Sequence, residues 1–79
     1  MYITITITAF NKSHDVQIDN RQQIRAAAEI LQETGRLPFY SIAYYRSRTQ
    51  QRIVSAFNTF EQENIQTGDE LSQIEVTVA

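Results

Sequence analysis

The chain has 79 residues, of which 42% are hydrophobic, and its formal net charge is −2. This length and apolar content predict one small domain, residues 1–79, with a single modest core. The sequence contains no Cys, which excludes a disulfide framework and thiol chemistry. It lacks the pattern of a signal peptide and any run of about 20 apolar residues, so we expect a cytoplasmic protein without direct membrane insertion.

The charge is distributed unevenly along the chain. All seven basic residues lie in residues 1–52, where four acidic side chains leave a net +3, whereas residues 53–79 carry five acidic side chains and no basic one. The negative total argues against a dedicated nucleic-acid binder. The two halves can pair across one sheet and neutralise each other, or the acidic half can attract a basic partner.

The first predicted element is a strand over Tyr2–Thr8, in which Ile and Thr alternate strictly. This period of two sends the three Ile side chains to the core and the three Thr side chains to the opposite face of the sheet. A turn is predicted at Asn11–Ser13. The returning strand, His14–Asp19, then directs Val16 and Ile18 inward.

A helix is predicted over Arg21–Thr34. Its apolar residues recur at the 3.6-residue period and form one buried stripe of Ile24, Ala27, Ala28 and Leu31. Asn20 is predicted to cap the first turn, with Gln23 at capping-box spacing. Gly35 ends the helix because glycine adopts the left-handed conformation at low cost, and Leu37 can fold back on the last turn.

Two further strands are predicted after the helix. The third strand, Phe39–Arg46, is predicted to direct Ile42 and Tyr44 inward and Ala43 and Tyr45 outward. A polar turn over residues 47–51 then leads to a short fourth strand, Arg52–Ser55.

The remaining residues predict a short helical turn and a last strand. Thr59 can cap the helical turn together with Gln62, and Asn64 suits a left-handed residue. Gly68–Asp69 marks a tight turn before a strand over Glu70–Val78. Leu71 is out of phase with Ile74, Val76 and Val78, so a bulge is predicted near Ser72–Gln73.

The order β-β-α-β-β, with a short helical turn before the last strand, is that of the β-grasp, and the sequence resembles ubiquitin. The residues that carry this resemblance are Ile24, Gly35, Leu37 and Pro38, and the run Thr59–Gln66. The resemblance implies an α+β fold in which one mixed sheet packs on one helix.

Within that superfamily the sequence is most similar to the bacterial YukD-type proteins, of which EsaB is a relative. It shares their Met-Tyr-Ile start and their Ile-x-x-Gly-Asp-x-Leu pattern, here Ile65–Leu71. The resemblance implies an accessory or regulatory component of the type VII secretion system of Gram-positive bacteria. The chain continues through Ser72–Ala79 where those proteins typically stop, which leaves a generic ubiquitin-like module open.

The sequence offers no catalytic, cofactor or metal constellation. His14 has no second His or Cys with which to share a metal, and it is expected to lie on the surface at a strand end. The acidic residues Glu61, Glu63, Asp69 and Glu70 are expected to form a solvated face. Three Arg residues near several Tyr residues suggest a nucleic-acid patch only weakly and are more typical of a soluble turn.

The best candidate binding surface is the sheet face away from the helix, which is predicted to display Tyr2, Thr4, Thr6, Ala43 and Tyr45. These observations predict a non-catalytic module that binds a protein partner. A covalent modifier or sulfur carrier is the alternative, disfavoured because the chain ends in Val76–Ala79 rather than in Gly-Gly. An engineered or excised domain is a third possibility.

Overall fold

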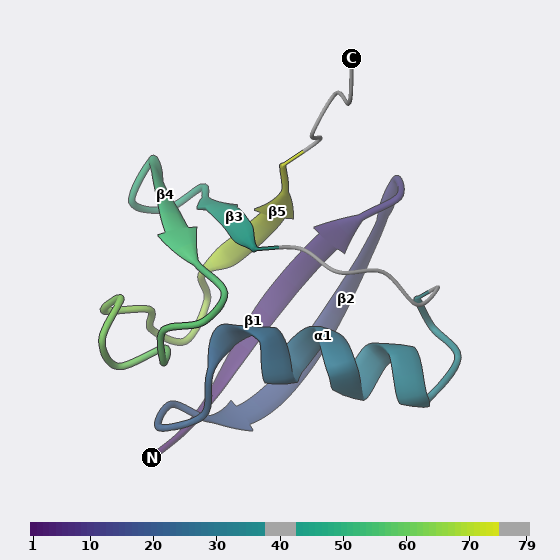
Figure 1. Cartoon of the computed structure of the whole chain (residues 1–79), viewed down its shortest axis with the longest axis horizontal. Helices are drawn as coiled ribbons and strands as arrows, with labels where there is room; N and C mark the ends of the chain where they lie inside the picture. Colours follow the sequence, from purple (N-terminus) through teal and green to yellow (C-terminus); the bar gives the residue numbers. More distant parts are fainter. Residues whose placement is uncertain (38–42, 75–79) are drawn as a thin grey trace.

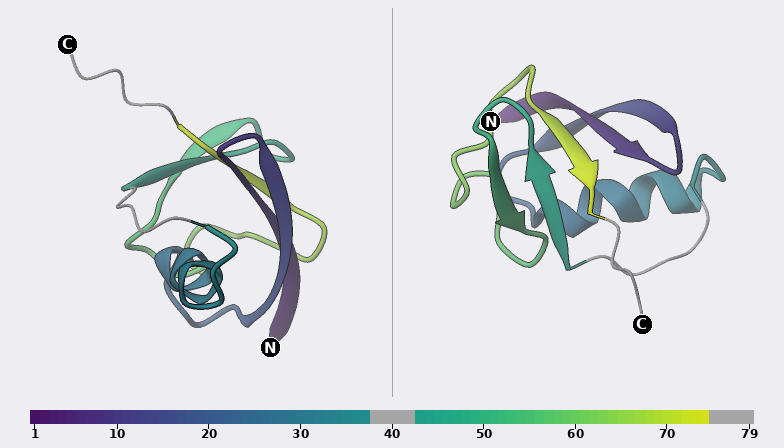
Figure 2. Two further views of the ribbon diagram at one scale, coloured as in Figure 1. Left: turned by 90° about the vertical axis from the view of Figure 1, so that its right-hand side faces the viewer. Right: turned by 90° about the horizontal axis from the view of Figure 1, so that it is seen from above.

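The computed structural model describes residues 1–37 and 43–74, in which one helix lies across one face of a five-stranded sheet (Figure 1; Figure 2, left). The elements are β1 (Tyr2–Ala9), β2 (Lys12–Asp19), α1 (Ile24–Glu33), β3 (Tyr44–Ser47), β4 (Arg52–Ser55) and β5 (Glu70–Gln73). The strands are ordered β2-β1-β5-β3-β4. β1 and β5 are parallel and the other neighbours antiparallel. The predicted α+β architecture is confirmed.

The first hairpin follows the predicted alternation. Ile3, Ile5 and Ile7 are buried and lie opposite Ile18, Val16 and His14 of β2. The connecting turn lies one residue earlier than predicted, at Phe10 and Asn11, which have φ values of 53° and 62°. Positive φ at both central residues suits a two-residue hairpin loop, because the twist of such a turn matches that of the strands.

The N-terminus of α1 differs from the prediction. The helix begins at Ile24, and its N-cap residue Gln23 makes no side-chain capping hydrogen bond. Instead, the backbone N–H groups of Ile24 and Arg25 donate to the carbonyls of Asn58 and Ala56, at 2.9 Å each. Asn20 is therefore not the cap, because backbone carbonyls from a distant segment already satisfy the first helical donors.

The helix α1 ends as predicted. Gly35 has φ 76°, and its N–H donates to the Gln32 carbonyl at 3.1 Å. The next N–H, that of Arg36, donates to the Leu31 carbonyl at 2.9 Å. These two bonds form a Schellman motif. Leu37 then returns to the core, where it is buried.

The segment between β4 and β5 closes one end of the core. Thr59 and Gln62 form the predicted capping box, with the Gln62 N–H donating to Thr59 Oγ1 at 3.0 Å and the Thr59 N–H donating to Gln62 Oε1 at 2.8 Å. Asn64 has φ 57°, as predicted. Phe60 and Ile65 are buried on either side of this turn.

The described part of the last strand is shorter and more regular than predicted. Glu70, Leu71 and Ser72 pair in unbroken register with Thr6, Ile7 and Thr8. β5 also pairs with β3 without interruption as far as Gln73, so no bulge occurs over Glu70–Gln73. The predictions for Phe39, Ile42, Val76 and Val78 fall outside the described residues.

Ion pairs connect the basic first half of the chain with its acidic second half. Arg48 Nη1 lies 3.4 Å from Glu70 Oε1, and Arg52 Nη1 lies 3.6 Å from Glu63 Oε1. These contacts support local neutralisation between the two halves. The predicted solvated acidic face is wrong for Asp69, which is buried against Ser47.

Candidate functional site

The sheet face away from α1, called the outer face below, is the candidate interaction surface. Strand alternation places Thr4, Thr6 and Thr8 of β1 on it, because the intervening Ile side chains face the helix. Tyr44 and Arg46 of β3 also lie on this face, since Tyr45 and Ser47 are buried on the other. No described helix covers the outer face (Figure 2, left).

Three of the predicted binding residues lie together along β1. Tyr2 is 69% exposed and Thr4 is also exposed, whereas Thr6 is half-buried. The Thr6 hydroxyl donates to Asp15 Oδ1 at 2.7 Å across the β1–β2 pair. Thr8, one step further along, donates to Glu70 Oε1 at 2.9 Å. The middle of β1 thus uses its hydroxyl groups to connect neighbouring strands.

The predicted phase of the third strand is wrong. Tyr45 is 1% exposed and belongs to the core, whereas Tyr44 is 56% exposed on the outer face. Tyr45 lies opposite Val54 of β4, which is fully buried. Ala43, half-buried, shares the phase of Tyr45 and not that of the outer face. Tyr45 and Ala43 are therefore not part of an exposed surface.

With Tyr44 and Arg46 facing outward, the outer face also includes residues that were not predicted to lie on it. Ile53 of β4 is 58% exposed and lies directly opposite Arg46. Tyr44 is opposite Ser55, which makes Tyr44 and Ile53 diagonal neighbours on the same face of the β3–β4 pair. We call Tyr44, Arg46 and Ile53 the Tyr44–Ile53 patch. The turn over residues 48–51 sets the register that places Tyr45 against Val54, but Ile53 and Val54 are both apolar, so the sequence does not show which of them faces inward.

The charged groups beside the outer face are largely paired. Arg48 contacts Glu70, and the guanidinium of Arg21 contacts Asp19 at 3.0 Å, at the end of β2 next to Tyr2. Hydrogen bonds from the side chain and backbone of Arg21 hold the pKa of Asp19 well below its ordinary value. This carboxylate stays ionised far into the acidic range.

His14 is the one histidine, and its environment differs from the expected strand-end surface. It lies opposite Ile7 on the core side of the hairpin and is half-buried. Its Nε2 atom is buried and has no hydrogen-bond partner among the described residues. Within residues 1–37 and 43–74, no group of three His, Cys, Asp or Glu side chains is arranged to hold a metal ion.

Among the described residues, no helix has the length and apolar character needed to cross a membrane.

Comparison with solved structures identifies the architecture. The chain superimposes with a TM-score of 0.73 on a protein designed de novo on the basis of ubiquitin, at 20% identity, covering 99% of this chain and 93% of that one. The fold is the ubiquitin-like β-grasp. The C-terminal ubiquitin-like domain of mouse tubulin-specific chaperone E matches with a TM-score of 0.61 at 12% identity, covering 99% of this chain and 92% of that one.

A third similar structure is the EccD5 ubiquitin-like domain from Mycobacterium xenopi. It matches with a TM-score of 0.57 at 16% identity and covers 100% of this chain and 99% of that one. No protein-family model matches the sequence, and a search of curated proteins finds no relative. These similarities concern the ubiquitin-like fold, which typically serves non-catalytic modules.

Proposed function

We propose that this protein is a non-catalytic interaction module that binds a protein partner through the outer face of β3 and β4. The observation that carries the proposal is the Tyr44–Ile53 patch, in which two large apolar side chains, each more than half exposed, are neighbours on paired strands. A tyrosine on a strand supplies apolar area and a polar end at low conformational cost, as interface anchors do.

The surroundings of the patch also suit a protein partner. Arg46 lies directly opposite Ile53 and two residues after Tyr44 on the same face, and arginine is enriched at interfaces. Arg48 and Arg52 are held by Glu70 and Glu63, so they add little free positive charge for a nucleic acid. Tyr2, Thr4 and Thr6 extend the proposed surface along β1.

The proposal includes a role as an accessory or regulatory component of a Gram-positive type VII secretion system, in the cytoplasm. Two observations support it. The Ile65–Leu71 pattern resembles that of the YukD-type proteins. The EccD5 domain, a ubiquitin-like domain of a mycobacterial type VII secretion system, is similar to this chain in fold.

Site-specific photocrosslinking tests the proposed surface. Benzoylphenylalanine placed at Ile53 should crosslink a discrete protein in a lysate of the cells that make this chain, and Tyr44→Ser should abolish that adduct. Glu29, exposed on α1 and therefore on the opposite side of the sheet, is the matched control position. Identical adducts from Ile53 and Glu29, or an adduct unaffected by Tyr44→Ser, would exclude the patch as the partner site.

The secretion role is tested by identifying the crosslinked protein by mass spectrometry. A membrane ATPase or another subunit of the secretion machinery is the expected result. A specific adduct with an unrelated protein would keep the interaction module and refute its place in type VII secretion.

A further inference from the structure

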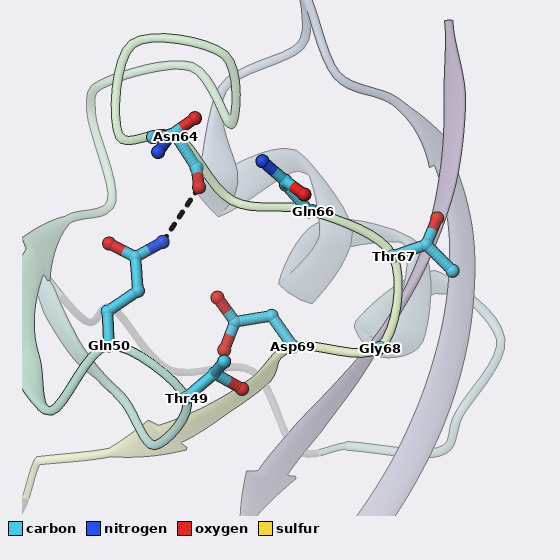
Figure 3. A pocket seen from close by; sticks show the side chains of 7 residues that line it. All are labelled: Thr49, Gln50, Asn64, Gln66, Thr67, Gly68 and Asp69. Carbon is cyan, nitrogen blue, oxygen red and sulfur yellow. Dashed lines mark hydrogen bonds between the residues drawn. The ribbon is translucent and has the colours of Figure 1, made fainter.

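A pocket of about 440 Å³ lies between the β3–β4 turn and the loop that leads into β5 (Figure 3). Polar side chains and one glycine line it: Thr49, Gln50, Asn64, Gln66, Thr67, Gly68 and Asp69. Among these described residues, Asp69 is the one that carries a charge. The pocket is therefore a polar site with a single carboxylate.

The Asp69 carboxylate is buried but has few donors. The residue is 3% exposed, and Figure 3 shows its carboxylate directed toward the space between Thr49 and Gln50. Ser47 Oγ lies 3.0 Å from one carboxylate oxygen and 3.1 Å from the other. A hydroxyl carries one hydrogen, whereas a carboxylate can accept about four hydrogen bonds. No other described residue donates to the side chain of Asp69.

The carboxylates closest to Asp69 in the sequence differ from it because they have cationic partners. Glu63 is paired with Arg52, and Glu70, the next residue in the chain, is paired with Arg48. No described cationic side chain lies within ion-pair distance of Asp69. Buried charges are normally compensated by a partner of opposite sign. Among the described residues, Asp69 is therefore the carboxylate at this pocket that has no ion-pair partner.

Further polar groups around Asp69 have unused hydrogen-bonding capacity. The side chains of Thr49, Asn64 and Gln66 line the pocket and make no hydrogen bond within the described part of the chain. Gln50, in contrast, is fixed: its Nε2 donates to the Asn64 carbonyl at 2.7 Å. The hydroxyl and amide oxygens of these side chains can accept hydrogen bonds from a ligand held by the carboxylate.

We propose that this pocket binds the ammonium group of a lysine side chain from a partner protein, with Asp69 as its counter-ion. An ammonium has three donors and no acceptor, and in lysine it lies at the end of a flexible four-carbon stem. A lysine ammonium binds as a point charge and does not require the planar, bidentate geometry that a guanidinium favours. The origin of the lysine in a partner protein rests on the proposed function, whereas binding of the ammonium group does not.

A probe that needs no partner tests the site. Nα-acetyl-lysine methylamide is titrated into the ¹⁵N-labelled protein, and binding is followed through the amide chemical shifts. Nα-acetyl-norleucine methylamide, which is similar in shape but uncharged, is the control ligand. Saturable shifts at Thr49, Gln66 and Gly68 are expected with the lysine probe alone. Asp69→Asn should weaken binding by about tenfold, because a hydrogen bond to a charged group is lost. Glu29→Gln, an exposed carboxylate on α1 that does not line the pocket, should leave the affinity unchanged.

A second variant keeps the test decisive if Asp69→Asn does not fold. Gln66 is exposed, and Gln66→Lys would place a competing ammonium at the pocket, so it should abolish the shifts, whereas Gln17→Lys on β2 should not. Equal shifts with both probes, or undiminished affinity for the lysine probe in Asp69→Asn or Gln66→Lys, would overturn the proposal. The Asp69–Ser47 hydrogen bond would then serve only to stabilise the fold. A failed crosslink at Ile53 would count against the proposed function alone.

Discussion

Replacing Tyr45 by Ala should destabilise the protein severely, whereas the same change at Tyr44 should not. Tyr45 is 1% exposed, and a buried aromatic side chain removes about 150–250 Å² from water. At about 25 cal/mol per Å² this burial corresponds to about 4–6 kcal/mol, and aromatic-to-Ala changes in cores cost about 3–5 kcal/mol. A domain of this size has a total stability of about 4–12 kcal/mol, so Tyr45→Ala alone can unfold it.

Urea unfolding followed by circular dichroism measures both variants. Tyr44 is 56% exposed, and Tyr44→Ala should change the free energy of unfolding by less than about 1 kcal/mol. Tyr45→Leu retains apolar volume and provides a folded intermediate case if Tyr45→Ala has no native baseline. If Tyr44→Ala were the more destabilising of the pair, the register that places Tyr45 against Val54 would be wrong.

Three further changes test other features. Gly35→Val should lower the free energy of unfolding by about 1–3 kcal/mol mainly through backbone strain, since no atom beyond the neighbouring residues lies within 4 Å of an added Cβ; an unchanged urea midpoint would contradict this. Thr59→Ala should lower the free energy of unfolding by about 1 kcal/mol in the same assay, and Thr59→Ser by much less, because serine keeps the capping hydroxyl. Equal losses for the two variants would contradict the capping role of Thr59. Arg21 lowers the pKa of Asp19 in the folded state. The ionised carboxylate therefore stabilises the folded protein fully at pH values above its unfolded-state pKa of about 4, and this stabilisation is lost as the pH falls through the folded-state pKa. The stability difference between wild type and Asp19→Asn should therefore shrink in acid, and a difference independent of pH would refute the linkage.

The first hairpin and the buried stripe of α1 were predictable because their patterns are long and unambiguous. In Tyr2–Thr8 every second residue is Ile, so a shift of one position would expose the whole set. The helix has one apolar stripe and one glycine suited to its end. Local sequence and global fold agree in these segments, and the structure confirms them.

The phase of the third strand was not predictable in the same way. Ala43, Tyr44 and Tyr45 form an uninterrupted apolar run, so both phases offer an aromatic side chain to the core. The decisive residue is Ser47, which is fully buried although serine is usually exposed. Its burial depends on Asp69, a partner 22 residues away. A contact of that separation leaves no signal in the local pattern.

The prediction that Asn20 caps α1 was wrong for a related reason. Asn20 and Gln23 have the spacing of a capping box, but the carbonyls of Ala56 and Asn58 reach the first helical N–H groups. Whether a distant backbone segment takes these donors is decided by the tertiary fold. At Thr59 no such competitor is present among the described residues, and the same spacing does form a capping box.

The parallel pairing of β1 with β5 has a consequence for how the chain folds. β1 is synthesised before the other described strands, yet its register with β5 joins Thr6 to Glu70 and Thr8 to Ser72, contacts between residues far apart in the sequence. Loop closure over such a separation is entropically costly and slows the folding of small domains. On the ribosome, β1 and β2 can form their hairpin early. The centre of the sheet can be completed only after β5 has left the exit tunnel, so Ile7 and its neighbours remain accessible to chaperones until then.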